Sequence, residues 1–284
     1  MQPSSRQPTL SLRQRYYWRV LLLGIILYYI ANRALRASGN INLVPTVLLL
    51  GSFLVPVAFV VFIAENETHD LRGFGDVALA FLFGGVLGTA TATLLEVEFV
   101  RTLSLGTLFL VALSEEFAKL LGIVWLLRRQ EYLSEAHGLV FGAAAGMGFA
   151  AFESMGYGLT FFLLSRGNLD VVGSVLLTRG LLSPFGHGTW TALVASTMWR
   201  ERAEGRSIVG LPVLGAFLTA VILHTAWDFF ASVPLMGVVV PGLDVQISLL
   251  IVGAIGLALL YLRMRESNQQ SSTINLTTPW PAHS

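Results

Sequence analysis

The sequence predicts an all-α protein: a bundle of about eight transmembrane helices that forms a single membrane domain. Hydrophobic residues make up 54% of the 284-residue chain and charged residues only 12%, about half the charged share of a typical soluble domain. The mean hydropathy is +0.69. Long apolar stretches alternate with short polar ones, which is the pattern of helices that cross a bilayer.

Eight segments are long enough to cross about 30 Å of hydrocarbon at ~1.5 Å per residue. The first carries tyrosines and a tryptophan at its ends, as suits the interfacial aromatic belts, and we expect it to remain as a signal anchor. The predicted spans lie near residues 17–35, 42–64, 77–95, 103–127, 138–164, 171–199, 208–231 and 243–262.

The polar ends, 1–15 and 266–284, are expected to be disordered, on either side of a membrane domain over 16–265. With the N-terminus inside, arginines concentrate in the segments that would be cytoplasmic, whereas only Arg33, Arg36, Arg101 and Arg166 fall on the other side. The bias and the even number of spans place both termini in the cytoplasm.

Composition also excludes several kinds of chemistry. The chain has no cysteine, so disulfides, thiolate metal sites and cysteine nucleophiles are ruled out. The net charge is +1 and no basic patch is present, which argues against nucleic acid as a partner.

The pairs Gly84/Gly88 and Gly142/Gly146 are four residues apart, a spacing that predicts close approach of helices.

Ionisable residues interrupt the predicted spans, although each costs ~2.5–3.5 kcal/mol at the bilayer centre and marks a functional hypothesis. The glutamates and histidines on four consecutive spans lie about 11–16 residues, or ~17–24 Å, from the cytoplasmic ends, so we expect them to share one layer. The interrupting residues are Glu115, Glu116, Lys119, Glu153, Arg179, His187, His224 and Asp228.

Local spacing predicts how these side chains meet. His224 and Asp228 are four residues apart and share a helix face. Lys119 follows Glu115 by four residues and Glu116 by three, so it can neutralise one carboxylate and leave the other available.

The pattern favours an activated water, and hydrolysis is its natural use. A glutamate base with histidine donors could activate the water without a metal. Oxygen and nitrogen ligands would equally suit zinc. The candidate ligands are Glu116, Glu153, His187, His224 and Asp228.

Other polar residues receive simpler interpretations. Arg179 is assigned a structural role or a position reaching towards the outer face. His69, His137 and His283 lie in loops or the tail and are expected to be solvated.

Four motifs in order along the chain resemble the PrsW family of intramembrane proteases, which are related to CAAX prenyl proteases and bacteriocin-processing enzymes. They are Glu115-Glu116-x-x-Lys119, Gly148-Phe149-Ala150-x-x-Glu153, the isolated His187, and His224-x-x-Trp227-Asp228. The resemblance covers about residues 75–235. Lys119 and Asp228 stand where CAAX-type enzymes often have Arg and Asn, which argues against prenyl-protein processing.

The resemblance implies a multi-pass peptidase of the bacterial plasma membrane that cuts a membrane-anchored protein near the non-cytoplasmic face. For the best-known members that substrate is an anti-sigma factor. It further implies that Glu115 or Glu116 is the base and that His187 and His224 are ligands or oxyanion donors. Glu153 and Asp228 would support them, and the resemblance leaves metal dependence open.

Two other hypotheses account for the same residues. Intramembrane Glu, His and Lys also mark proton- or ion-coupled transporters; these often contain inverted repeats and broken helices. No repeat is evident, although Pro184 and the glycines near His187 could break the sixth span. In a non-catalytic scaffold the polar residues would only pair between helices, so Glu115→Gln would impair assembly rather than activity.

Overall fold

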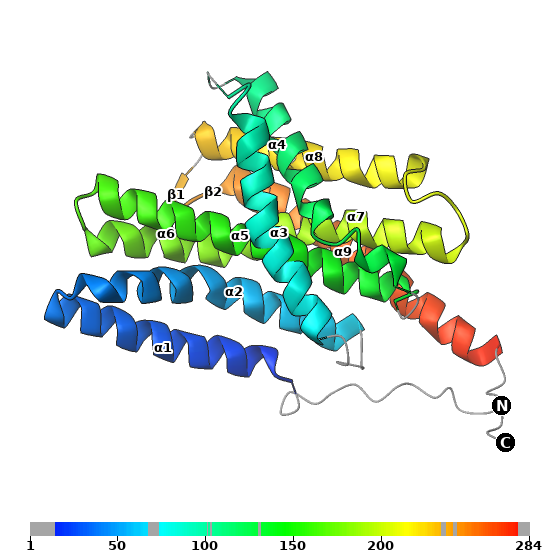
Figure 1. Ribbon diagram of the computed structural model, residues 1–284, viewed down its shortest axis with the longest axis horizontal. Helices are drawn as coiled ribbons and strands as arrows, with labels where there is room; N and C mark the ends of the chain where they lie inside the picture. The colour runs from blue at the N-terminus through cyan, green and yellow to red at the C-terminus, as the bar shows by residue number, and fades with distance from the viewer. Residues whose placement is uncertain are drawn as a thin grey trace.

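The computed structural model describes residues 15–67, 74–100, 102, 104–129, 132–233, 237–240 and 243–277, and within them confirms the predicted all-α membrane bundle (Figure 1). Its α-helices are α1 (Tyr17–Ser38), α2 (Val44–Glu67), α3 (Phe74–Glu96), α4 (Leu105–Leu121), α5 (Glu135–Leu164), α6 (Leu169–Leu182), α7 (His187–Ala203), α8 (Leu211–Ser232) and α9 (Ile247–Thr277). Three short 3-10 turns, η2 (Ile41–Leu43), η4 (Leu126–Arg128) and η5 (Ser183–Phe185), connect some of them.

Helix α5 is the centre of the bundle. It contacts α2, α3, α4, α6, α7 and α9, and most of its residues are buried. Figure 1 shows α1 and α2 as an antiparallel pair along one edge, with α3 crossing over α5. Residues of these six helices therefore pack around α5.

Glycines allow neighbouring helices to approach α5 closely. This confirms the packing role predicted from their spacing. A Cβ on Gly84 would lie 2.4 Å from the Ala145 carbonyl oxygen, and a Cβ on Gly146 would lie 2.2 Å from the His187 carbonyl oxygen. Since real Cβ atoms essentially never show contacts under 3.0 Å, larger residues at these two positions would push α3 and α7 away from α5.

The sixth predicted span, 171–199, is two helices rather than one. Helix α6 ends at Leu182, η5 follows, and α7 begins at His187. Pro184 lacks the N–H that a continuous helix requires, and Gly186 has non-helical backbone angles (φ −116°, ψ −122°). The break places His187 at the first residue of a helix, in the interior of the bundle.

Two more boundaries differ from prediction. The span predicted over 103–127 is helical only to Leu121 and continues as a turn and η4. Gly122, the first residue after α4, packs against the backbone of Gly84. The span predicted from 243 begins instead with a hairpin of β1 (Gly237–Val240) and β2 (Leu243–Gln246), in which Gly237 pairs with Gln246 and Val240 with Leu243.

The C-terminal tail was predicted to be disordered from 266, but α9 continues to Thr277. Of the N-terminal segment 1–15 only Arg15 is described, and its guanidinium donates to Asn66 Oδ1 at 3.0 Å. Residues 1–14, 278–284 and 68–73, and with them His69 and His283, lie outside the described residues.

Six described helices are long and apolar enough to cross a membrane: α1, α2 with its preceding turn, α3, α5, α8 and α9. The other three, α4, α6 and α7, have 17, 14 and 17 residues. At ~1.5 Å per residue these are shorter than a ~30 Å hydrocarbon core. All three carry polar residues of the candidate site.

Candidate active site

Glu116 on α4 is the most completely engaged carboxylate of the site. Its side chain is 1% exposed, and its Oε1 accepts from Lys119 Nζ at 2.7 Å and lies 2.9 Å from His224 Nδ1. Thr191 Oγ1 donates to Oε2 at 3.5 Å. A carboxylate held from three sides in this way is suited to anchoring its neighbours.

Lys119 links the glutamate pair to His187. Its side chain is fully buried, and Nζ lies 3.4 Å from Glu115 Oε2 and 2.8 Å from His187 Nδ1. The ammonium also sits 4.2 Å from the ring centre of Phe149. Because an ammonium only donates, His187 Nδ1 must accept, and the ring proton belongs on Nε2.

The protonated Nε2 of His187 faces a carboxylate on α5. It lies 3.2 Å from Glu153 Oε2, which is also 2.8 Å from the guanidinium of Arg179. Arg179 donates from Nε to Ser154 Oγ at 3.1 Å and stacks over Tyr157, 4.1 Å from its ring centre. Arg179 therefore belongs to the polar network itself, as the partner of Glu153.

His224 on α8 is enclosed by acidic groups. Its Nδ1 faces Glu116, while Nε2 lies 3.6 Å from Glu115 Oε2 and 3.4 Å from Asp228 Oδ2. The indole of Trp190 stacks on the ring, with centres 4.9 Å apart and planes at 29°. Two carboxylates therefore face the same ring nitrogen, Nε2.

All seven predicted site residues therefore meet in one network, which extends to Arg179. Its contacts run from Asp228 through His224, Glu116, Lys119, His187 and Glu153 to Arg179, with Glu115 beside Lys119 and His224.

A cavity of about 340 Å³ between α3, α4 and α5 borders the network. Glu115 and Glu153 line it, together with Glu96 at the end of α3. Ser114 Oγ donates to Glu96 Oε1 at 3.4 Å. The cavity gives Glu115 room for a water that the enclosed Glu116 lacks.

Sequence reasoning missed three of these groups. Glu96 ends its span and therefore resembles an ordinary boundary residue. Thr191 was detectable, because it follows His187 by four residues and shares its helix face. Trp190, fully buried against both histidine rings, carries no such sequence signal.

One group of donors in the described chain is compact enough for a metal ion. Glu115, His187 and His224 each offer one atom, and these lie within 4.8 Å of one another. Two imidazoles and a carboxylate form a known catalytic zinc set, and Glu116 on His224 Nδ1 is the outer-shell carboxylate such a ligand commonly has. Both nitrogens of His187 are engaged, so its ligation requires one contact to open. In this group the carboxylate is Glu115, whereas the sequence-based set contained Glu116.

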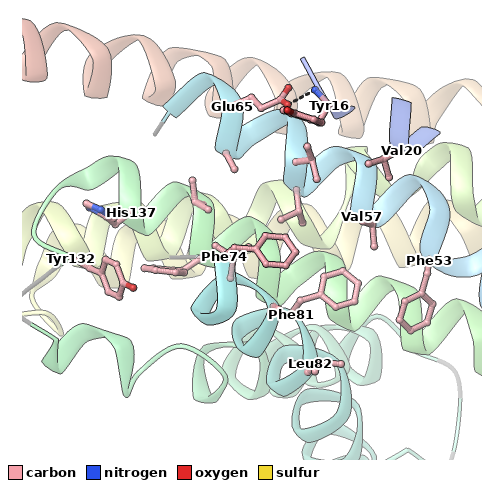
Figure 2. A pocket seen from close by; sticks show the side chains of 17 residues that line it. Tyr16, Val20, Phe53, Val57, Glu65, Phe74, Phe81, Leu82, Tyr132 and His137 are labelled. Carbon is pink, nitrogen blue, oxygen red and sulfur yellow. Dashed lines mark hydrogen bonds between the residues drawn. The ribbon is translucent and has the colours of Figure 1, made fainter. Parts of the chain in front are cut away.

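A separate apolar cavity of about 630 Å³ lies between α2, α3 and α5 and contains none of the network residues (Figure 2). Phe53, Val57 and Phe81 are among its lining residues, with His137 at one end. His137 was expected to be a solvated loop residue. It is instead half-buried in the first turn of α5, where Ser134 and His137 cap the helix.

The fold and the network define a multi-pass membrane protein with a buried carboxylate–histidine site. A family model described as PrsW family intramembrane metalloprotease matches residues 74–266. The chain therefore belongs to the PrsW family of intramembrane proteases and is a hydrolase that acts on membrane proteins within the bilayer. Neither a curated protein nor a solved structure matches it. Helices α1 and α2 precede the matched region.

Proposed function

We propose that the protein is an endopeptidase of the bacterial plasma membrane that cleaves a single-span protein, of the anti-sigma-factor type, near the non-cytoplasmic face. The observation that carries this proposal is the convergence of Glu115, His187 and His224 within 4.8 Å in the interior of the bundle. The substrate class and the side of cleavage follow from the family resemblance, and the arginine bias sets which helix ends lie outside.

The two adjacent glutamates have different roles in this mechanism. Glu116 is the anchor, because Lys119, His224 and Thr191 occupy it. Glu115 is the base: it borders the cavity, and its contact with Lys119 is the longer one, at 3.4 Å against 2.7 Å. It takes a proton from a cavity water, whose oxygen then attacks the scissile carbonyl carbon.

His224 stabilises the charge that develops on the carbonyl oxygen, with the ring of His187 beside it. Its Nε2, which faces Glu115 and Asp228, is the donor to that oxygen. Lys119 and Glu153 hold the ring of His187 in one tautomer. When the carbon–nitrogen bond breaks, the proton on Glu115 passes to the leaving amine.

The family is described as metalloproteases, and the donor set fits a zinc ion held by Glu115, His187 and His224. Bound there, zinc would polarise the carbonyl and make the attacking water more acidic. Lys119 would then orient His187, and Glu116 would orient His224, as ligands of the ion.

Access to the site supports cleavage near the outer face. The cavity extends from Glu115 to Glu96, the last residue of α3, and the arginine bias places this end of α3 outside. A helical substrate bonds its own backbone groups, so a segment must unwind before its carbonyl can meet Glu115.

The test is to express wild type, Glu115→Gln and His224→Ala at equal membrane levels and to profile new protein N-termini by mass spectrometry. Glu98→Gln is the matched control, because Glu98 is exposed just beyond α3. We expect termini near the outer ends of substrate spans with wild type and the control, and their loss in both site variants. Identical termini in all four strains would refute the proposal and make ion flux, the transporter hypothesis, the next assay.

A further inference from the structure

A further cavity, of about 280 Å³, lies among α5, α6, α7, α8, the start of α9 and the end of the hairpin. His187 and Arg179 line it, so it is continuous with the catalytic network. Trp227 and Leu249 are among its apolar walls, and Gln246 at the end of β2 contributes a carboxamide.

The carboxamide oxygen of Gln246 has no hydrogen-bond partner among the described residues. This atom, Oε1, is buried. An unsatisfied buried acceptor is unfavourable, and a donor arriving with a ligand removes that penalty. Arg179, the cation in this cavity, is already paired with Glu153 and Ser154.

The size of the cavity limits what enters it. One turn of helix, ~10 Å across and ~5.4 Å high, fills roughly 400 Å³, which exceeds the cavity volume of about 280 Å³. A side chain projecting from an unwound segment is small enough. Its charge is limited too, since an ammonium would face Arg179 and a carboxylate would face the oxygen of Gln246.

We infer that this cavity is a substrate subsite that takes the side chain of a residue flanking the scissile bond, and that Gln246 selects an uncharged hydrogen-bond donor there. A carboxamide or a hydroxyl satisfies Gln246 Oε1, while the apolar walls hold its carbon atoms. The inference rests on the proposed function and specifies the segment that function acts on.

The test compares wild type with Gln246→Leu and Gln246→Asn by the same N-terminal profiling, scoring residue preference around the cleaved bonds. Ser248→Ala is the matched control: Ser248 Oγ is likewise buried without a partner in the described chain, but it does not line the cavity. Glu115→Gln identifies the termini that depend on the active site. Equal membrane levels and melting temperatures establish that each variant is folded.

With wild type and Ser248→Ala we expect one flanking position rich in Asn, Gln, Ser or Thr. In Gln246→Leu this preference should fall about five- to tenfold in favour of apolar residues, as loss of one buried hydrogen bond implies. Gln246→Asn, which keeps the amide on a shorter stem, should retain part of the preference. An unchanged preference in folded Gln246→Leu would overturn the inference alone. The absence of Glu115-dependent termini from wild type would instead overturn the proposed function and this inference with it.

Discussion

Substituting Gly146 by alanine tests the geometry of the site without altering any of its chemical groups. Gly146 is the point where α5 meets the start of α7. A Cβ there would lie 2.2 Å from the His187 carbonyl oxygen and 2.8 Å from Thr191 Oγ1. The first neighbour is backbone, so it cannot avoid the new methyl group by changing rotamer.

The magnitude follows from these distances. Ordinary contact begins near 3.4 Å, so the start of α7 must move by at least about 1 Å. Overpacking of this kind costs ~1–3 kcal/mol of folding free energy. A displacement of ~1 Å at a reacting group can lower the rate about 100-fold, and here the displaced group is His187.

The assay measures thermal unfolding in detergent and the cleavage rate of the substrate found by profiling. Gly215→Ala in α8 is the matched control, because a Cβ at Gly215 meets nothing within 4 Å. Alanine there should leave the melting temperature unchanged or raise it slightly, since glycine lowers helix stability, and the rate should stay that of wild type.

If Gly146→Ala has the same melting temperature and cleavage rate as Gly215→Ala, the close contact between α5 and α7 is refuted. The placement of His187 by backbone packing is then refuted as well. A lower melting temperature with an unchanged rate would confirm the contact but reject the claim that catalysis depends on the position of His187.

Three further predictions concern the charges of the site. Glu115→Gln should abolish cleavage with little loss of stability. Glu116→Gln should lower the free energy of unfolding by ~3–5 kcal/mol, because buried Lys119 loses its shortest partner. If Glu115→Gln is instead the destabilised variant and Glu116→Gln the inactive but stable one, Glu116 is the base and Glu115 the anchor. Arg179→Met should lower the free energy of unfolding by ~1–3 kcal/mol, because it leaves the Glu153 carboxylate without its cation. Adding Glu153→Gln should restore part of that free energy, since the unpaired carboxylate is then gone. A double variant no more stable than Arg179→Met would contradict the pairing of Arg179 with Glu153. If zinc binds the group of Glu115, His187 and His224, a zinc chelator should stop cleavage and added zinc should restore it, whereas full activity of protein shown metal-free by elemental analysis would exclude the metal site and leave Glu115 as the base.

Much of the site was predictable from sequence because intramembrane charge is costly. Glu115, Glu153, His187 and His224 each interrupt an apolar helix, and the shared depth of the site residues predicted that they would meet, as the structure confirms. Helical spacing likewise predicted that Asp228 lies beside His224. It also predicted that Lys119 neutralises one glutamate of the pair; Lys119 contacts both, Glu116 at 2.7 Å and Glu115 at 3.4 Å. These are local properties of single helices and need no knowledge of the tertiary structure.

Packing between helices decided the rest. Which glutamate borders a cavity depends on the rotation of α4 against α3 and α5, and spacing along one helix does not encode that rotation. Glu96 looked like a boundary residue, and Arg179 was assigned a structural or outward-reaching role. The packed helices place Glu96 at the cavity and pair Arg179 with Glu153. The sequence alone determined that this is a membrane protein with buried carboxylates and histidines, because transfer of charge into hydrocarbon depends on composition. Only the tertiary structure distinguished the anchoring Glu116 from the accessible Glu115, because burial and partners are properties of the assembled bundle.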